Sequence, residues 1–279
     1  MRQIFNNDSI NQLIERNGYA VIPFLKENTI EKLKSFYKQL PATNSRGTHV
    51  TMFNPSDEYR KTVDNRIKEL CAAEAENLMN GYRTLYTNYM IKEPGPEGDF
   101  PVHQDWTYVD ENIFTSIALW IPLQDVNAEN GALQVVKGSH KFITKLRGPY
   151  VHEPFQKISG LIKSSYSTGI ELKAGEALAW DHRLIHFSNP NISSTPRLAF
   201  TLIMVPKKAE VFHYFGLQES RGIKMEKFRV DTNFYFKYKI GSRPIGVDLV
   251  ETIEQPLEFF TSEKFTAIFT AINNNAASI

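Results

Sequence analysis

Cysteine is almost absent from this 279-residue chain, in which Cys71 is the single copy. One thiol can form neither an intrachain disulfide nor a cysteine-based zinc site, so we expect a reducing compartment. Long apolar runs are also missing: pieces such as LAFTLIMV fall well below the roughly 18 consecutive apolar residues of a membrane helix. The first twenty residues hold no apolar run of signal-peptide length. The sequence therefore predicts a cytoplasmic protein without a membrane span.

A surplus of charge of either sign is missing as well. Lys and Arg number 32 and Asp and Glu number 31, so the formal net charge is +1. Without a global positive field, nucleic acid is not an expected partner. Hydrophobic residues make up 42% of the chain and charged residues 23%, as in ordinary folded proteins. An enzyme or a binding domain fits this composition, and no pattern reveals the oligomeric state.

The first third of the chain has a helical texture. Residues 8–17, with Asp8 as the expected N-cap, and residues 27–40 have the spacing of amphipathic helices, and the strand-like NGYAVIPFL stands between them. Residues 57–81 form a longer helical pattern that ends at a glycine. We therefore predict that residues 1–84 are a helical N-terminal support.

Short β-rich runs replace this pattern between residues 85 and 206. They are LYTNYMI, FPVHQDWTYV, TSIALWIPL, ALQVVKG, IELKAGEALAW, LIHFS and RLAFTLIMV, with turn sequences such as EPGPEG and AENG between them. Many short strands without a helix after each one favour an antiparallel sandwich or barrel. Residues 138–169 form a long insert without clear period, which is typical of functional or mobile connections.

The clearest chemical feature is His103-Gln104-Asp105 inside an expected strand. Residues i and i+2 of a strand project from one face, so His103 and Asp105 can reach the same metal ion. A second histidine would complete the two-histidine, one-carboxylate set, which leaves positions of Fe(II) open for O2 and a bidentate keto acid. His-x-Asp alone matches often by chance, so the rest of the pattern matters.

Two later residues extend the pattern. His186 lies on the strand-like LIHFS, and Arg197 follows eleven residues later on RLAFTLI. A guanidinium there could hold the distal carboxylate of 2-oxoglutarate by a charge-assisted, bidentate pair. Ser188 would share the face of His186, and Thr201 that of Arg197, and either hydroxyl could bond a carboxylate or only the local backbone.

Other residues compete for the same roles. His182 precedes His186 by four residues, which on a helix would place both on one face as in zinc sites. Gly175 and the β-rich flanks speak against a helix there, so we interpret His182 as a structural residue near a turn. We interpret Trp106 as a core aromatic residue.

Several segments in order resemble the phytanoyl-CoA dioxygenase-like family of iron(II)/2-oxoglutarate oxygenases. They are GYAVIPFL, YMIKEPG, VHQDW, LWIPLQDVNAENGALQVVKGSHK, LKAGEALAWDHRLIHFSNPN and PRLAFTL, and together they span roughly residues 18–206. The resemblance implies a mainly β protein with flanking α-helices and a double-stranded β-helix core, the jelly-roll or cupin-like fold, over residues 85–206. We then expect one domain over 1–279, with residues 207–279 as a C-terminal extension and candidate lid.

The same resemblance implies roles for single residues. The family's iron ligands match His103, Asp105 and His186, and the residue that salt-bridges 2-oxoglutarate matches Arg197. The positions that contact or wall the 2-oxoglutarate pocket match Gln104, Trp120 and Ser188. His140, in GSHK, would have a structural or substrate-side role.

The implied activity is hydroxylation of a small molecule by Fe(II), 2-oxoglutarate and O2, with release of succinate and CO2. Halogenating relatives carry a small residue where this chain has Asp105, and the carboxylate therefore favours hydroxylation or another oxidative outcome. The alternatives are a cupin-type metal enzyme that does not use 2-oxoglutarate and an inactive binding protein on the same barrel. The substrate stays undetermined, although side chains of the insert and tail could meet an anionic group: Lys145, Arg147, Tyr150, Tyr214 and Arg221.

Overall fold

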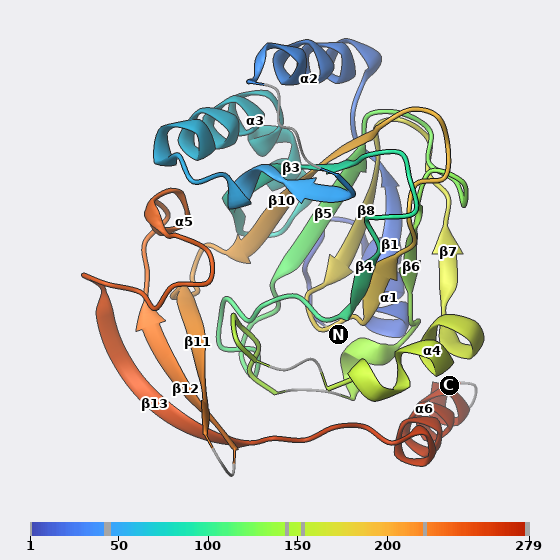
Figure 1. The fold of residues 1–279 in the computed structure, drawn as a ribbon, viewed down its shortest axis with the longest axis vertical. Coiled ribbons are helices and arrows are strands. Elements are labelled where there is room, and N and C mark those ends of the chain that lie inside the picture. The colour runs from blue at the N-terminus through green and yellow to red at the C-terminus, as the bar shows by residue number, and fades with distance from the viewer. Residues whose placement is uncertain (1, 42–45, 143–144, 152–153, 220–221, 277–279) are drawn as a thin grey trace.

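The computed structural model describes residues 2–41, 46–142, 145–151, 154–219 and 222–276, and it is a mainly β protein with helices at its periphery (Figure 1). None of the described helices is both long and apolar enough to cross a bilayer. Arg221, a candidate contact for an anionic group, lies outside the described residues.

The N-terminal helices agree with the sequence pattern. They are α1 (Asp8–Asn17), α2 (Glu27–Gln39) and α3 (Asp57–Leu78), with strand β1 (Tyr19–Pro23) between the first two. The expected N-cap Asp8 is wrong by one residue, because the side chain of Asn7 accepts the N–H groups of Ser9 and Ile10 and so satisfies the open donors of the first turn.

Two antiparallel sheets form the central part of the molecule. The larger has the order β1-β8-β5-β10-β3-β2 and the smaller the order β4-β9-β6-β7. Besides β1, the larger sheet contains β2 (Thr48–Val50), β3 (Tyr82–Lys92), β5 (Ile117–Pro122), β8 (Glu176–Asp181) and β10 (Arg197–Pro206). The smaller contains β4 (Phe100–His103), β6 (Leu133–Val135), β7 (Thr168–Ile170) and β9 (His186–Ser188).

The larger sheet is buried on both faces. Leu198, Phe200 and Leu202 of β10 pack with α2 and α3 in one apolar cluster, and the alternate residues Ala199 and Ile203 belong to a second cluster between the sheets. Side chains of a strand alternate between its faces, so a strand covered on both sides reads as an unbroken apolar run. Helices α2 and α3 therefore cover the outer face and leave the inner face for a cavity (Figure 1).

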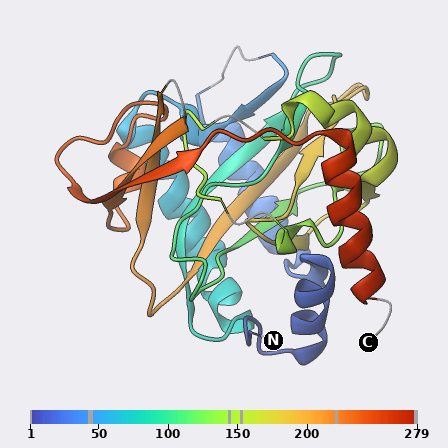
Figure 2. The same cartoon turned by 90° about the horizontal axis from the view of Figure 1, so that it is seen from below.

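The long insert folds into short helical turns. These are η2 (Ser139–Lys141), η3 (Gln156–Ile158), α4 (Ser159–Leu161) and η4 (Ile162–Tyr166), and η1 (Thr51–Phe53) lies earlier in the chain. The closing helix α6 (Ser262–Ala276), expected from SEKFTAIFTAI, lies beside the insert (Figure 2), where Phe265 packs with Phe155 and Tyr166.

The C-terminal part holds a sheet that the sequence did not predict. Strands β11 (Phe212–Glu219), β12 (Gly222–Arg229) and β13 (Asp248–Pro256) pair in that order, and α5 (Phe234–Lys237) lies between β12 and β13. Aromatic residues in this stretch, among them Phe212 and Tyr214, pack on the sheet rather than on a helix.

Candidate metal centre

Strand pairing brings the two histidines together. His103 ends β4 and His186 begins β9, and the antiparallel register sets these two residues opposite each other. Strand β4 stops at His103, so the expectation that Asp105 continues the same strand is wrong. Its backbone N–H instead donates to the carbonyl of His182 at 3.0 Å, which turns the carboxylate back toward the histidines.

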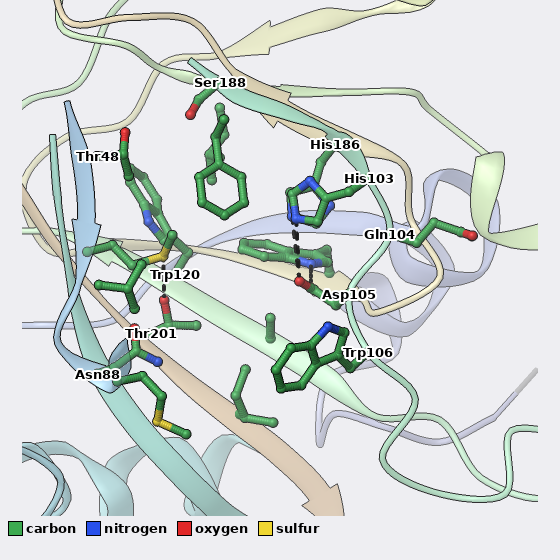
Figure 3. A pocket seen from close by; sticks show the side chains of 18 of the residues that line it. Thr48, Asn88, His103, Gln104, Asp105, Trp106, Trp120, His186, Ser188 and Thr201 are labelled. Carbon is green, nitrogen blue, oxygen red and sulfur yellow. Dashed lines mark hydrogen bonds and ion pairs between the residues drawn. The ribbon is translucent and has the colours of Figure 1, made fainter. Parts of the chain in front are cut away.

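The three side chains converge on one point. One Nδ1 or Nε2 atom of each histidine and one carboxylate oxygen of Asp105 all lie within 4.8 Å of one another. The Nε2 atoms of His103 and His186 are each 3.8 Å from Oδ1 of Asp105. Figure 3 shows both imidazoles and the carboxylate on the same side of the cavity.

The second nitrogen of each imidazole bonds to the backbone. Nδ1 of His103 lies 2.8 Å from the carbonyl of Pro101, and Nδ1 of His186 lies 3.0 Å from that of Leu184. A carbonyl only accepts, so each Nδ1 carries the hydrogen, and each Nε2 presents its lone pair toward Asp105. Such outer bonds fix the ring orientation that a metal ligand needs.

Protonation states suit a metal as well. Burial lowers the pKa of His103 to about 4, so the imidazole is neutral near pH 7. Burial raises the pKa of Asp105, but the imidazoles of His186, His182 and His103 and the hydrogen bond from Trp180 outweigh it, and the pKa is lowered. Two imidazoles and one carboxylate therefore face one another, which is the donor set of a mononuclear Fe(II) centre with open positions.

Arg197 is a buried cation without an anionic partner. Its side chain stacks over Trp120 at 4.9 Å, and Nη1 donates to the carbonyl of Gly131 at 2.8 Å. Within the described chain, no Asp or Glu forms an ion pair with it, and Nε has no hydrogen-bond partner. Burial lowers the pKa of Arg197 to about 10. A carboxylate from a bound ligand would supply the anionic partner that the described residues do not give Arg197.

Lys92, a residue that the sequence reasoning missed, lies next to Arg197. It is fully buried and donates to Oγ of Ser188 at 2.6 Å and to the carbonyl of Asn189 at 2.5 Å. The sequence held a signal for this position. Lys92 is an even number of residues from Tyr86 on the same strand, so both side chains point to the same face of the sheet. A lysine at the end of a strand is usually exposed to solvent, so its burial here could not be expected from its residue type.

One cavity joins these groups. Both sheets line it, and Arg197 is among its lining residues. The metal cluster, Ser188 and Trp120 also reach its wall (Figure 3). Gln104 also lines the cavity, but its side-chain amide points outward and donates to the carbonyl of Arg183 (Figure 3). Trp106, interpreted as a core residue, lines the cavity instead.

The rival histidines have other partners. Nδ1 of His182 lies 2.7 Å from Oγ of Ser116, and its Nε2 is 4.0 Å from Asp105, outside the group of three. His140 is buried and bonds through Nε2 to the carbonyl of Glu15. Both thus have the structural surroundings that the sequence suggested.

The candidate lid residues are mostly engaged. Arg147 pairs with Glu111 and Lys145 with Glu258, and Tyr214 is buried in the cluster on the C-terminal sheet. Tyr150 is exposed. The charge of Arg147 is already neutralised by the carboxylate of Glu111, so this side chain is held within the protein.

Comparison with known sequences identifies relatives. A model of the family described as Phytanoyl-CoA dioxygenase (PhyH) matches residues 14–199. The chain is 34% identical over 134 residues to a phytanoyl-CoA dioxygenase of Arabidopsis thaliana, a match that covers 45% of this chain and 46% of that protein. It is 27% identical over 199 residues to a phytanoyl-CoA dioxygenase domain-containing protein 1 homolog of Dictyostelium discoideum, with 67% of each chain covered. The chain thus spans about half the length of the Arabidopsis relative.

Solved structures share the fold. The epimerase SnoN, in complex with Fe3+, alpha ketoglutarate and nogalamycin RO, matches with a TM-score of 0.54 at 17% identity over 92% of this chain and 96% of that one. The alpha-ketoglutarate-dependent carbocyclase SnoK gives 0.54 at 18% identity over 74% and 86%. HygX, with nickel, 2-oxoglutarate and hygromycin B bound, gives 0.53 at 14% identity over 72% and 88%.

Proposed function

The chain belongs to the phytanoyl-CoA dioxygenase (PhyH) family, and we propose that it is an Fe(II)- and 2-oxoglutarate-dependent dioxygenase that hydroxylates a C–H bond of a small molecule. The convergence of two imidazoles and one carboxylate beside a buried guanidinium without an anionic partner carries this proposal. Three ligands are too few to saturate iron, and the open positions are what a chelating keto acid and O2 require.

The donor set fits Fe(II) held by Nε2 of His103, Nε2 of His186 and Oδ1 of Asp105. A centre of this kind supplies oxidative chemistry, in which 2-oxoglutarate and O2 become succinate and CO2 while a substrate C–H bond gains a hydroxyl group. Each ligand is held by the protein before the metal arrives: the two imidazoles through backbone carbonyls and the carboxylate through Trp180.

The cation end of the cavity is the proposed cosubstrate site. Arg197 would bind the distal carboxylate of 2-oxoglutarate, and Ser188 would add a hydrogen bond. Trp120 would hold the guanidinium plane by stacking, and its own Nε1 is buried without a partner among the described residues. An unpaired buried donor costs free energy, which a bound carboxylate would recover. Gln104 would hold the loop between His103 and Asp105 in place through its hydrogen bond to the carbonyl of Arg183, without a hydrogen bond to 2-oxoglutarate.

The arrangement of sheets supports a double-stranded β-helix core over residues 85–206, as the sequence suggested. Residues 1–84 would be its N-terminal support and residues 207–279 a C-terminal extension within one domain of 279 residues. The N-terminal part is more than support, because its strands β1 and β2 form both edges of the larger sheet.

Anaerobic titration tests the proposal. Fe(II) and 2-oxoglutarate together should produce the weak visible charge-transfer band of the chelate, and addition of O2 with a metabolite panel should release succinate. Absence of the band at saturating concentrations would contradict the assignment. Oxygen consumption with a substrate in the absence of 2-oxoglutarate would instead identify a cupin-type enzyme that does not use the keto acid.

A further inference from the structure

Three cross-strand pairs divide the cavity floor into zones. Strands β3 and β10 face each other in register, and their inward residues change character along the strands. The cationic pair Lys92 with Arg197 comes first. Beyond the apolar pair Met90 with Ala199 come a neutral polar pair, Asn88 with Thr201, and then an apolar aromatic pair, Tyr86 with Ile203. The proposed cosubstrate occupies the first zone, which leaves the other two for the substrate.

The far zone contains no charge. Met52, Trp106, Tyr108 and Ile240 complete its wall around Tyr86. Among the described residues that line the whole cavity, the carboxylate and guanidinium groups are those of the metal and cosubstrate sites. A charged substrate group in this zone would lose its hydration without a counter-charge, which is strongly unfavourable.

Two uncharged hydrogen-bonding groups remain unused in this zone and at its border with the polar zone. Oδ1 of Asn88 is buried without a partner among the described residues. The hydroxyls of Tyr86 and Tyr108 lie 2.6 Å apart, so one donates to the other and a single hydrogen stays available. Burial raises the pKa of both phenols, which keeps them neutral. The far zone and its border thus offer one donor, from the tyrosine pair, and one acceptor, from Asn88 (Figure 3), beside apolar walls.

We infer that the substrate portion entering this zone is uncharged and largely apolar, and that it carries a hydroxyl or carbonyl oxygen which Asn88 and the Tyr86–Tyr108 pair recognise. This inference rests on the proposed function, because it assigns the cationic zone to the cosubstrate. Apolar walls supply the binding free energy and the few polar groups orient the ligand, as in most small-molecule sites.

Binding of three matched probes tests this inference. The protein is loaded with redox-inert Zn(II) and saturating 2-oxoglutarate, and 4-ethylphenol, ethylbenzene and 4-ethylbenzoate are compared by ligand-observed NMR. The phenol should bind about tenfold more tightly than the hydrocarbon, as one or two neutral hydrogen bonds provide. The benzoate should bind more weakly than both. Asn88→Leu and Tyr86→Phe should each reduce the advantage of the phenol.

Each result has a clear meaning. Equal or tighter binding of the benzoate, or absence of binding by all three probes, overturns the inference. An advantage of the phenol that both variants retain overturns the assigned residues. Tyr86→Phe removes only one oxygen, so it covers the case in which Asn88→Leu does not fold. The iron chelate band is measured separately, and its absence would indicate failure of the proposed function instead.

Lys92 carries a second, independent inference. Its ammonium group has three N–H donors, and all three find acceptors: Oγ of Ser188 at 2.6 Å, the carbonyl of Ser188 at 3.3 Å and that of Asn189 at 2.5 Å. An ammonium cannot accept, so Ser188 keeps its own hydroxyl hydrogen. Ser188 lines the cavity and donates to no described protein group.

The space for this lysine is built into the neighbouring turn. Gly131, whose φ is +80°, accepts Arg197 at its carbonyl, and a Cβ there would lie 2.7 Å from Cδ of Lys92. Burial and the charge of Arg197 lower the pKa of Lys92 to about 7. Two basic groups thus share one buried zone, and no described acidic side chain forms an ion pair with either.

We propose that Lys92, in its protonated form, is a positioning residue for the cosubstrate: it turns the hydroxyl of Ser188 toward the distal carboxylate and adds a second positive charge beside Arg197. This also rests on the proposed function. A dicarboxylate keto acid would use this charge, whereas a keto acid that lacks the distal carboxylate would not.

Titration of the chelate band with two keto acids tests the role. Lys92→Met should raise the Kd of 2-oxoglutarate by roughly 10- to 100-fold, as for loss of a charge-assisted contact. The Kd of 2-oxobutyrate, which lacks the distal carboxylate, should stay unchanged. Adding Ser188→Ala to Lys92→Met should cost little more, because the lysine acts through that hydroxyl. Lys173→Met, which alters an exposed lysine paired with Asp125, is the matched control.

A purely structural role gives a different pattern. Equal weakening of both keto acids, or an unchanged Kd of 2-oxoglutarate in Lys92→Met, overturns the inference. The chelate band of the wild type separates failure of the Lys92 inference from failure of the proposed function. If the proposed function is wrong, no variant and no wild-type sample shows the band.

Discussion

Nε1 of Trp180 donates a 2.7 Å hydrogen bond to Oδ2 of Asp105, and the other carboxylate oxygen, Oδ1, is therefore the one that faces both histidines. Trp180 lies on β8 in the larger sheet, whereas Asp105 lies on the loop after β4 in the smaller one. The orientation of the carboxylate thus depends on how the two sheets are held together.

Trp180→Phe should weaken binding of Fe(II) by about 10- to 100-fold, the usual effect of losing an outer contact to a metal ligand. An aromatic side chain is kept at this position, so most of the buried volume stays filled. Anaerobic metal titration measures the change. Trp106→Phe is the matched control, because Trp106 lines the same cavity without a described bond to Asp105, and equal effects of both changes would contradict the role of Trp180.

Asp105→Ala should nearly abolish metal binding, because it removes the single anionic ligand of the proposed centre. The chelate band should then be missing at all concentrations of 2-oxoglutarate that saturate the wild type. Asp99→Ala, which removes an exposed carboxylate close to β4, should leave the band intact. Normal iron affinity in Asp105→Ala would rule out this ligand set.

Arg197→Ala should act on the cosubstrate rather than on the metal. We expect the Kd of 2-oxoglutarate to rise about 100-fold or more, since a bidentate charged contact is lost, while the affinity for Fe(II) alone stays near that of the wild type. Arg197→Lys should recover only part of the loss, because an ammonium lacks the planar fork. Parallel loss of both affinities would point to a structural role.

The buried pair of Arg147 and Glu111 should contribute to both stability and the site. Nε of Arg147 donates to the carbonyl of Asp105 at 2.7 Å, and its other nitrogens bind Glu111. Glu111→Gln should lower the free energy of unfolding by about 3 kcal/mol, because it leaves a buried cation unpaired. The double change Arg147→Met with Glu111→Leu should restore most of it, and urea unfolding measures both. If the losses in the free energy of unfolding of the two single variants simply add in the double variant, the pairing of Arg147 with Glu111 is contradicted.

Stability should depend on pH through Lys92. Its pKa is about 7 in the folded protein and about 10.4 in an unfolded chain, so between these values the unfolded state binds more protons and stability rises with pH. Relative to Lys92→Met, the wild type without ligands should gain about 1 kcal/mol per pH unit between pH 7.5 and 9.5. Identical slopes in urea unfolding would show that Lys92 is not buried as described.

Local patterns were enough to predict the helices and most central strands. The period of α1, α2 and α3 is visible in the sequence, and so are the β-rich runs of the core, because each depends on neighbouring residues. The strand that begins at Phe100 was predicted too long. The chain leaves β4 after His103, and the N–H of Asp105 bonds to the carbonyl of His182, which is 77 residues away in sequence. Such long-range hydrogen bonds cannot be predicted from the pattern of neighbouring residues.

The same distinction applies to the site. His103, Asp105, His186 and Arg197 were candidates because their residue types fit the chemistry, and the structure brings them to one cavity. Lys92 was missed because a lysine is interpreted as exposed unless its surroundings are known. The sheet β11–β13 was missed for a related reason, because aromatic residues occur in helices and strands alike and pairing between the three strands decides the outcome.

The most direct test of the account is a crystal structure grown without O2 in the presence of Fe(II) and 2-oxoglutarate, with anomalous scattering recorded at the iron edge. The account predicts one iron peak bonded to Nε2 of His103, Nε2 of His186 and Oδ1 of Asp105, with the distal carboxylate of the keto acid on Arg197. An iron peak elsewhere, or a keto acid that does not reach Arg197, would contradict it.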